Sequence, residues 1–215
     1  MKTNKLRMPV DILMTLVSIV LMGGSYLFPA DIVHEILGVA LFVLWAVHIT
    51  LNRRWYGAVF RGRYNARRIL QTSINCSILI CTVFLMISGI ILSNHIFTFL
   101  GIEGGLGFAR VAHLLASHWY FLFMSLHIGL HVEMILSKLK IRPLILRIIL
   151  TIVCLYGMYA FMCRGIWKYL ILRQQFFFFD LEKGYVIFVL DYIAIIFLFA
   201  AISHIIAKLL QEKKK

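Results

Sequence analysis

Long apolar runs constrain this chain more than any other feature of its sequence. A helix needs about 20 apolar residues to cross a hydrocarbon core about 30 Å thick. Six stretches of about this length occur, at 9–28, 33–51, 71–92, 112–136, 144–162 and 185–207. Backbone in lipid must satisfy its own hydrogen bonds, and the runs lack the alternation of barrel strands, so each predicts a membrane-spanning helix.

Composition agrees with this interpretation. Of the 215 residues, 62% are hydrophobic and only 14% are charged, far from the averages of soluble domains. The first run follows a basic segment but no A-x-A cleavage site follows it, so we expect an uncleaved first span. The predicted fold class is an all-α integral membrane protein with six transmembrane helices.

The basic residues predict how the helices are oriented, because Lys and Arg are retained on the cytoplasmic side. Six spans place both termini on one face. If that face is cytoplasmic, the inner segments hold seventeen of the 22 basic residues and five remain outside. Topology and contact with anionic lipid headgroups therefore account for the net charge of +13, and no nucleic-acid partner is predicted.

Histidines inside the apolar runs point to function, since an ionisable residue is costly in lipid. His34 and His48 lie fourteen residues apart on the second span. In a helix this spacing corresponds to about 21 Å of rise and leaves both rings on the same face, within about 40° of each other. The fourth span repeats the spacing with His113 and His127.

The second and fourth spans run in the same direction, so His34 is level with His113 and His48 is level with His127. Two imidazoles at matched depth on facing helices are what a b-type haem needs for its axial positions. The absence of C-x-x-C-H argues against covalently attached haem. We therefore predict two haem b groups, an outer one and an inner one.

Several neighbouring residues have two interpretations. His131 lies on the same helix face as His113 and competes with His127 for the inner iron, although His127 fits the level of His48 better. Gly38 could let a flat macrocycle approach the backbone or could serve close helix packing. Arg53 and Arg110 could pair with haem propionates or anchor the helices at headgroups.

Other polar residues in the spans have simpler interpretations. We expect His95, His118 and His204 to be hydrogen-bonded to the backbone of a neighbouring helix rather than to ligate a metal. Asp191 is the one acid well inside a span, and a hydrogen bond to a neighbouring Tyr or Ser is expected for it.

A second function from a different class uses the same histidines. His127, His131 and His48 could bind zinc or iron in a membrane metal-dependent enzyme. Such enzymes cluster histidines in tight boxes near one membrane face, whereas the histidines here divide between the two faces. This division favours the cytochrome.

Four stretches of the chain resemble the flavinylation-associated cytochromes, bacterial membrane proteins often encoded near extracytoplasmic flavin-transfer systems. The stretches are HEILGVALFVLWAVHITLNRRW, ISGIILSNHIF, HLLASHWYFLFMSLHIGLH and FFFFDLEKGYVIFVLDYIAIIFLFAAISH. The resemblance implies a dihaem electron conduit related in design to the four-helix cytochromes b. It also implies a bacterial inner membrane and an extracytoplasmic flavoprotein as partner.

The combined prediction is an electron-transfer cytochrome. Residues 1–142 are expected to form a four-helix dihaem core, and 143–215 two further helices joined by an aromatic extracytoplasmic loop. Electrons are expected to pass from a quinol or a cytoplasmic donor, through both haems, to an extracytoplasmic acceptor that carries flavin. Both termini are expected in the cytoplasm, with membrane lipid around the spans.

Overall fold

The computed structural model describes residues 3–28, 30–61, 63–133, 143–178 and 184–212. Within these ranges the chain is helical and contains no strand. The long helices are α1 (Thr3–Leu21), α2 (Asp31–Leu51), α4 (Ala66–Ile91), α5 (Leu106–Leu130), α7 (Pro143–Cys163) and α9 (Gly184–Glu212). The short elements are η1 (Ser25–Leu27), α3 (Arg53–Ala58), η2 (Thr98–Leu100) and α8 (Ile166–Leu170).

Five of the long helices, α2, α4, α5, α7 and α9, are long and apolar enough to cross a membrane. The all-α class and the membrane-spanning character predicted from the sequence are thereby confirmed. The first helix differs from its prediction, because α1 begins at Thr3 and ends at Leu21 rather than covering 9–28. Gly24 adopts φ 63 directly after it, and the chain continues as η1.

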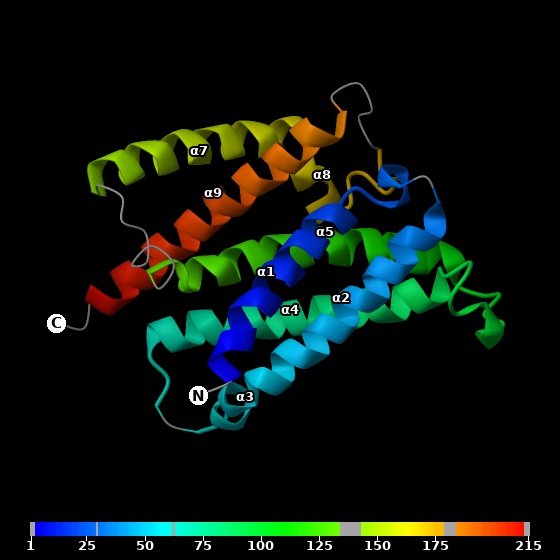
Figure 1. Ribbon diagram of the computed structural model, residues 1–215, viewed down its shortest axis with the longest axis horizontal. Helices are drawn as coiled ribbons and strands as arrows, with labels where there is room; N and C mark the ends of the chain where they lie inside the picture. The colour runs from blue at the N-terminus through cyan, green and yellow to red at the C-terminus, as the bar shows by residue number, and fades with distance from the viewer. Residues whose placement is uncertain (1–2, 29, 62, 134–142, 179–183, 213–215) are drawn as a thin grey trace.

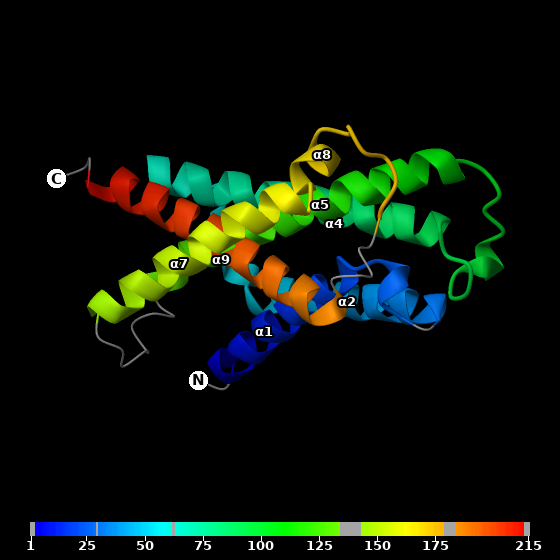
Figure 2. The same ribbon diagram turned by 90° about the horizontal axis from the view of Figure 1, so that it is seen from above.

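The long helices alternate in direction along the chain (Figure 1). The starts of α1, α4 and α7 and the ends of α2, α5 and α9 lie toward one end of the molecule. The connections after α1, α4 and α7 lie toward the other end, as the second view also shows (Figure 2). This alternation is what the predicted topology requires, while the side of the membrane that each end faces stays a prediction.

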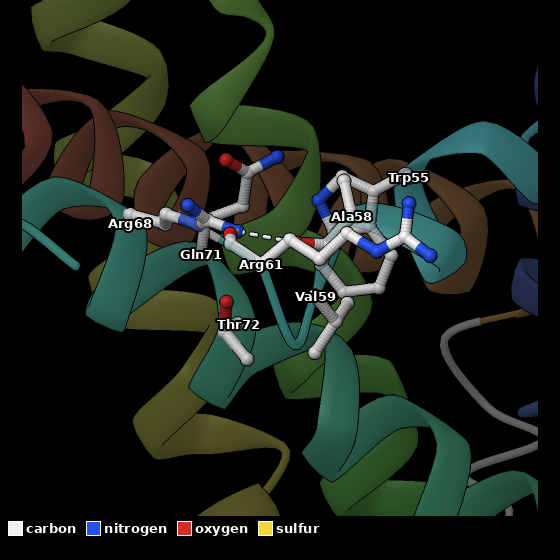
Figure 3. Close-up of a pocket in the computed structure, with 7 residues that line it drawn as sticks. All are labelled: Trp55, Ala58, Val59, Arg61, Arg68, Gln71 and Thr72. Atoms are coloured by element: carbon white, nitrogen blue, oxygen red, sulfur yellow. Dashed lines mark hydrogen bonds between the residues drawn. The ribbon is translucent and has the colours of Figure 1, made fainter. Parts of the chain in front are cut away.

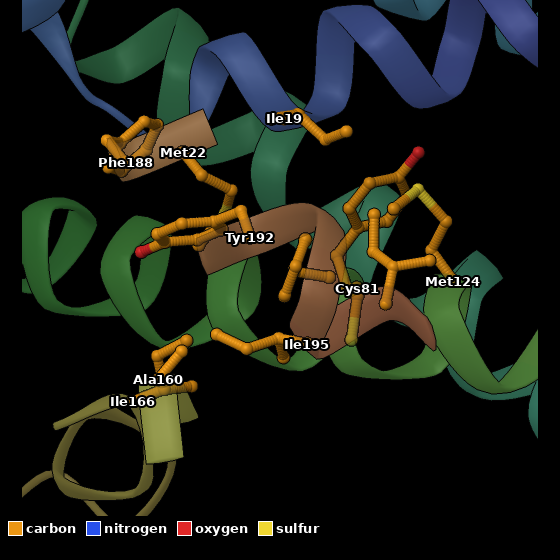
Figure 4. Packing of buried hydrophobic residues seen from close by; sticks show 12 residues of the cluster. Ile19, Met22, Cys81, Met124, Ala160, Ile166, Phe188, Tyr192 and Ile195 are labelled. Atoms are coloured by element: carbon orange, nitrogen blue, oxygen red, sulfur yellow. The ribbon is translucent and has the colours of Figure 1, made fainter. Parts of the chain in front are cut away.

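Helix α5 is the centre of the packing. It lies against α4 on one side and α9 on the other, α7 packs on α9, and α1 packs along α2. The buried core draws on α1, α4, α5, α7, α8 and α9 (Figure 4). Its residues are Ile19, Met22, Cys81, Tyr120, Phe121, Met124, Ala160, Ile166, Phe188, Tyr192, Ile195 and Ile196. The core therefore joins the segments 1–142 and 143–215 rather than leaving them separate.

The segment between α7 and α9 begins inside this core. Ile166 and Tyr169 of α8 are buried, and Trp119 of α5 donates a hydrogen bond of 3.1 Å to the Leu170 carbonyl. The predicted aromatic loop is thus tied to α5 at its start. Residues 179–183 of that loop, and residues 134–136 of the predicted fourth span, lie outside the described residues.

Two glycines bring α9 close to its neighbours. A Cβ at Gly129 of α5 would overlap Ser203 Oγ and the Ala200 carbonyl, and a Cβ at Gly157 of α7 would overlap the Ala194 carbonyl. The hydrophobic effect does not drive helices together in lipid, so close approach of the backbones through small residues is a main source of packing energy there. The α5–α9 and α7–α9 contacts therefore depend on the missing side chains.

We predict that Gly129→Ala and Gly157→Ala each destabilise the folded protein by about 1–3 kcal/mol, because the added methyl group must displace the α9 backbone. Thermal unfolding of the purified protein in detergent measures the effect. Gly107→Ala is the matched control, since a Cβ at this position of α5 meets nothing within 4 Å. Equal melting temperatures for all three variants would contradict the close-approach argument.

Candidate functional site

The structure brings His34 of α2 and His113 of α5 together. Their ring centroids lie 6.4 Å apart, with an angle of 62° between the ring planes. A metal ion bound by one nitrogen of each ring from opposite sides would separate the ring centres by roughly 6 Å, since metal–imidazole bonds are about 2.0–2.1 Å long. The predicted outer pair therefore has a spacing that one metal centre between the rings can use.

Ser88 of α4 sets the tautomer of His113. The Ser88 hydroxyl donates to the Phe84 carbonyl at 2.5 Å, so its oxygen accepts from His113 Nδ1 at 3.0 Å. His113 consequently carries its proton on Nδ1 and keeps a lone pair on Nε2 for a ligand. Gly89 lies beside the same ring, where a Cβ would stand 3.7 Å from its Cε1 atom.

His34 lies near the start of α2, and its Nδ1 atom is buried without a hydrogen-bond partner among the described residues. The next residue, Glu35, fixes this end of the helix. Its carboxylate accepts from the Ser93 hydroxyl at 2.7 Å and from the amides of the following turn, Asn94 at 2.8 Å, His95 at 3.3 Å and Ile96 at 3.0 Å. Glu35 thus joins α2 to the segment after α4 directly beside His34.

We predict that Glu35→Ala frees the turn after α4, because hydrogen bonds to a charged acceptor contribute about 1.5–3 kcal/mol each. Amide hydrogen exchange should become at least about tenfold faster at Asn94 and Ile96. Asp31→Ala is the control, because it removes an exposed carboxylate from the first turn of the same helix. Unchanged exchange in Glu35→Ala would show that this turn is held by other contacts.

The inner histidines have oxygen partners of their own. His48 Nδ1 donates to the Asp11 carboxylate of α1 at 2.7 Å, and His127 Nδ1 donates to Asn75 Oδ1 of α4 at 2.8 Å. Nε2 is therefore the acceptor nitrogen of both rings, and on His48 the Asn52 side-chain amide lies 3.5 Å from it. The two rings interact electrostatically with each other, but a direct ring contact like that of the outer pair is not found for them among the described residues.

His131 lies at the C-terminal end of α5, one turn beyond His127. The two ring centroids are 5.0 Å apart, a proximity that residues four apart on a helix ordinarily have. His131 also interacts electrostatically with Asp11, His48 and Arg67. The geometry does not decide between His127 and His131 as the inner ligand, but only His127 has an oxygen partner that orients its ring in the described structure.

The remaining predicted site residues are on open surfaces. Gly38 is exposed on α2, and a Cβ there would meet nothing within 4 Å. Arg53 at the start of α3 and Arg110 in the first turns of α5 are also exposed. Their position near the ends of the helices agrees equally with headgroup anchoring and with propionate pairing.

Sequence reasoning missed several residues that hold the rings. Asp11, Asn75 and Ser88 each bond to a predicted ligand, and Arg7 donates to the Leu51 carbonyl at 2.8 Å while its Nε atom is buried without a partner in the described ranges. The sequence contains a signal that could have identified Asn75 and Ser88. Asn75 and Ser88 are polar residues thirteen apart in an apolar helix, close to the spacing of the histidine pairs.

Two polar groups in the spans have structural partners instead. His118 Nδ1 donates to the Leu114 carbonyl of its own helix at 2.8 Å, not to a neighbouring helix as expected, and its ring stacks on Tyr169 of α8 with centroids 4.3 Å apart. Its Nε2 atom is buried without a partner among the described residues. Asp191 accepts from the Tyr156 hydroxyl and pairs with Arg164 Nε at 2.7 Å. The tyrosine partner expected for Asp191 is confirmed, and the arginine partner is additional.

A pocket lies beside α3 and the start of α4 (Figure 3). Its lining residues are Trp55, Ala58, Val59, Arg61, Arg68, Gln71 and Thr72. The Arg68 guanidinium donates to the Ala58 and Arg61 carbonyls at 2.5 Å and 2.6 Å, so it closes the loop rather than facing a ligand. The pocket therefore has no group of reactive side chains that would assign chemistry to it.

No group of three or more His, Cys, Asp or Glu side chains suited to hold a metal ion occurs in the part of the chain that the structure describes. His127, His131 and His48 do not converge as a three-ligand zinc or iron site needs. A haem iron needs only two axial ligands from the protein, and a pair of histidines can supply them.

Comparison of the chain with protein-family models, with curated proteins and with solved structures finds no match.

Proposed function

We propose that the chain is a membrane cytochrome that carries electrons across the bilayer through two b-type haems. His34 and His113 would hold the outer haem, and His48 and His127 the inner one. The observation that carries the proposal is the 6.4 Å separation of the His34 and His113 rings on two different helices. This spacing is compatible with two axial imidazoles on one iron.

The hydrogen bonds of the rings support the same assignment. Three of the four Nδ1 atoms donate to an oxygen of Asp11, Asn75 or Ser88, which leaves Nε2 as the acceptor nitrogen of each of these rings. On His48 a bound metal would take the place of the Asn52 amide, which lies 3.5 Å from Nε2. Metal-bound histidines generally have such a partner at the second ring nitrogen, because it fixes the tautomer and the ring orientation.

The surroundings also suit a flat, largely apolar group. Helix α2 has no buried residue, and a Cβ at its Gly38, one turn from His34, would meet nothing within 4 Å. At the inner end, the buried Nε of Arg7 and the exposed Arg53 are candidate partners for propionates. When bound, each haem supplies one-electron chemistry, while the protein fixes its axial ligands and excludes water.

The donor, the acceptor and the membrane belong to the proposal as well. We assign electron entry to a quinol or a cytoplasmic donor and exit to an extracytoplasmic flavoprotein, on the basis of the resemblance to flavinylation-associated cytochromes. The distribution of basic residues supports both termini in the cytoplasm, and the bacterial inner membrane is assigned on the same resemblance. The alternative metal-dependent enzyme would use His127, His131 and His48.

Optical spectra and ligand variants test the cofactor assignment. The purified protein should show b-type reduced-minus-oxidised bands and two haems per chain. His34→Ala or His113→Ala should remove the outer haem, and His48→Ala or His127→Ala the inner one, each leaving about half the haem because the pairs lie at separate levels about 21 Å apart. Loss of haem in His131→Ala but not in His127→Ala would reverse the inner assignment. Bound zinc or non-haem iron without a Soret band would favour the enzyme.

Proteoliposomes test the route. With a reductant trapped on the cytoplasmic side, the protein should reduce a flavoprotein or an impermeant acceptor added outside. His34→Ala keeps the inner haem and should still be reduced from inside, yet it should pass few electrons out, because one haem leaves too wide a gap across a core of about 30 Å. Undiminished transfer by this variant would require a quinone-carried or single-haem mechanism.

A further inference from the structure

The four ligand candidates differ in what their Nδ1 atoms face. His48 donates to a carboxylate, that of Asp11, at 2.7 Å. His127 and His113 donate to neutral oxygens, the amide of Asn75 at 2.8 Å and the hydroxyl of Ser88 at 3.0 Å. His34 Nδ1 has no hydrogen-bond partner among the described residues. Within the described residues, the only carboxylate that is hydrogen-bonded to one of these rings therefore belongs to the inner pair, whereas Glu35 and Asp31 act on His34 only through space.

This difference has an electronic consequence for a ligating ring. A hydrogen bond from Nδ1–H to a carboxylate is charge-assisted and roughly twice as strong as one to a neutral acceptor. It shifts electron density onto the imidazole and makes Nε2 a more basic ligand. A more basic axial ligand stabilises the oxidised metal over the reduced one, so it lowers the reduction potential of the group it binds.

We infer that Asp11 is a positioning residue that makes the inner haem site the lower-potential of the two. The inference rests on the proposed function. One electron then moves downhill from the inner site, which is oxidised, to the outer site, which is reduced, and no proton or further reactant is needed. The carboxylate of Asp11 thereby gives the conduit a preferred direction, from the cytoplasmic side outward.

The local structure holds Asp11 in place for this role. Arg7, one turn earlier on α1, donates to the Leu51 carbonyl one turn beyond His48, so α1 contacts the end of α2 at two adjacent points. These contacts fix the register between the carboxylate and the ring. At the end of α2 itself, the Asn52 amide donates to the His48 carbonyl at 2.9 Å and lies 3.5 Å from His48 Nε2, where a bound metal would replace it.

Positive charges near the inner pair act in the opposite sense. Arg7 lies one turn from Asp11, and Arg67 interacts electrostatically with His131. Neither is bonded to a ligand candidate in the described structure, whereas Asp11 contacts the His48 ring directly. The direct bond acts through the ligand itself, so we expect its effect to exceed that of the arginines.

Potentiometric titration of the purified, haem-loaded protein tests the inference. The wild type should titrate as two components, and His48→Ala should lack the lower one. Asp11→Asn keeps an oxygen acceptor for the ring but removes the charge, so both haems should remain. The lower of the two reduction potentials should rise by about 59 mV or more in this variant. For a one-electron couple this shift changes the equilibrium constant for electron transfer between the haems by tenfold.

Two further variants complete the test. Asp11→Glu retains the charge and should keep the lower potential closer to that of the wild type than Asp11→Asn does. Glu133→Gln removes an exposed carboxylate next to the end of α5 and should leave both potentials unchanged.

The inference is overturned if Asp11→Asn leaves both potentials unchanged, if it shifts only the upper one, or if Glu133→Gln shifts the lower one equally. Each of these results leaves the two-haem proposal intact. A protein that binds no haem would overturn the proposed function itself.

Discussion

The requirement that a polar ring in lipid has a partner organises this structure. An unpaired polar group in an apolar environment costs several kcal/mol, so each imidazole within a span needs an oxygen from a neighbouring element or a ligand. His48 finds Asp11 on α1, and His127 and His113 find Asn75 and Ser88 on α4. Helices α2 and α5, which carry the two histidine pairs, are thereby tied to α1 and α4.

The attachment of helix α2 to the rest of the bundle depends on polar contacts. It has no buried residue, although its sequence is apolar throughout the centre. Its described polar attachments lie at the two ends, Glu35 with the turn after α4 and His48 and the Leu51 carbonyl with α1. The residues of the apolar centre between them are exposed or half-buried.

The sequence predicts the helices well because hydropathy and length are local properties. It predicts the ligand candidates because their spacing repeats on two helices, and the contact of His34 with His113 agrees with the expected depth match. The end of α1 was misjudged because the apolar run continues beyond Leu21, where Gly24 adopts φ 63 and stops a regular helix. Hydropathy contains no information on that backbone change.

The partners of the rings could not be predicted in the same way, because they depend on how helices rotate and cross. Asp11 lies near an interface where charge is inexpensive, so its position alone does not distinguish a solvated acid from one that holds a ring. Helix α5 is fixed by α4 on one side and by α9 on the other, with Gly129 in close contact with α9. The histidines of α5 therefore stand on the rigid part of the bundle. The histidines of α2 lie on a helix that polar contacts attach only at its two ends. The distance between the two rings of each pair is therefore set mainly by the position of α2.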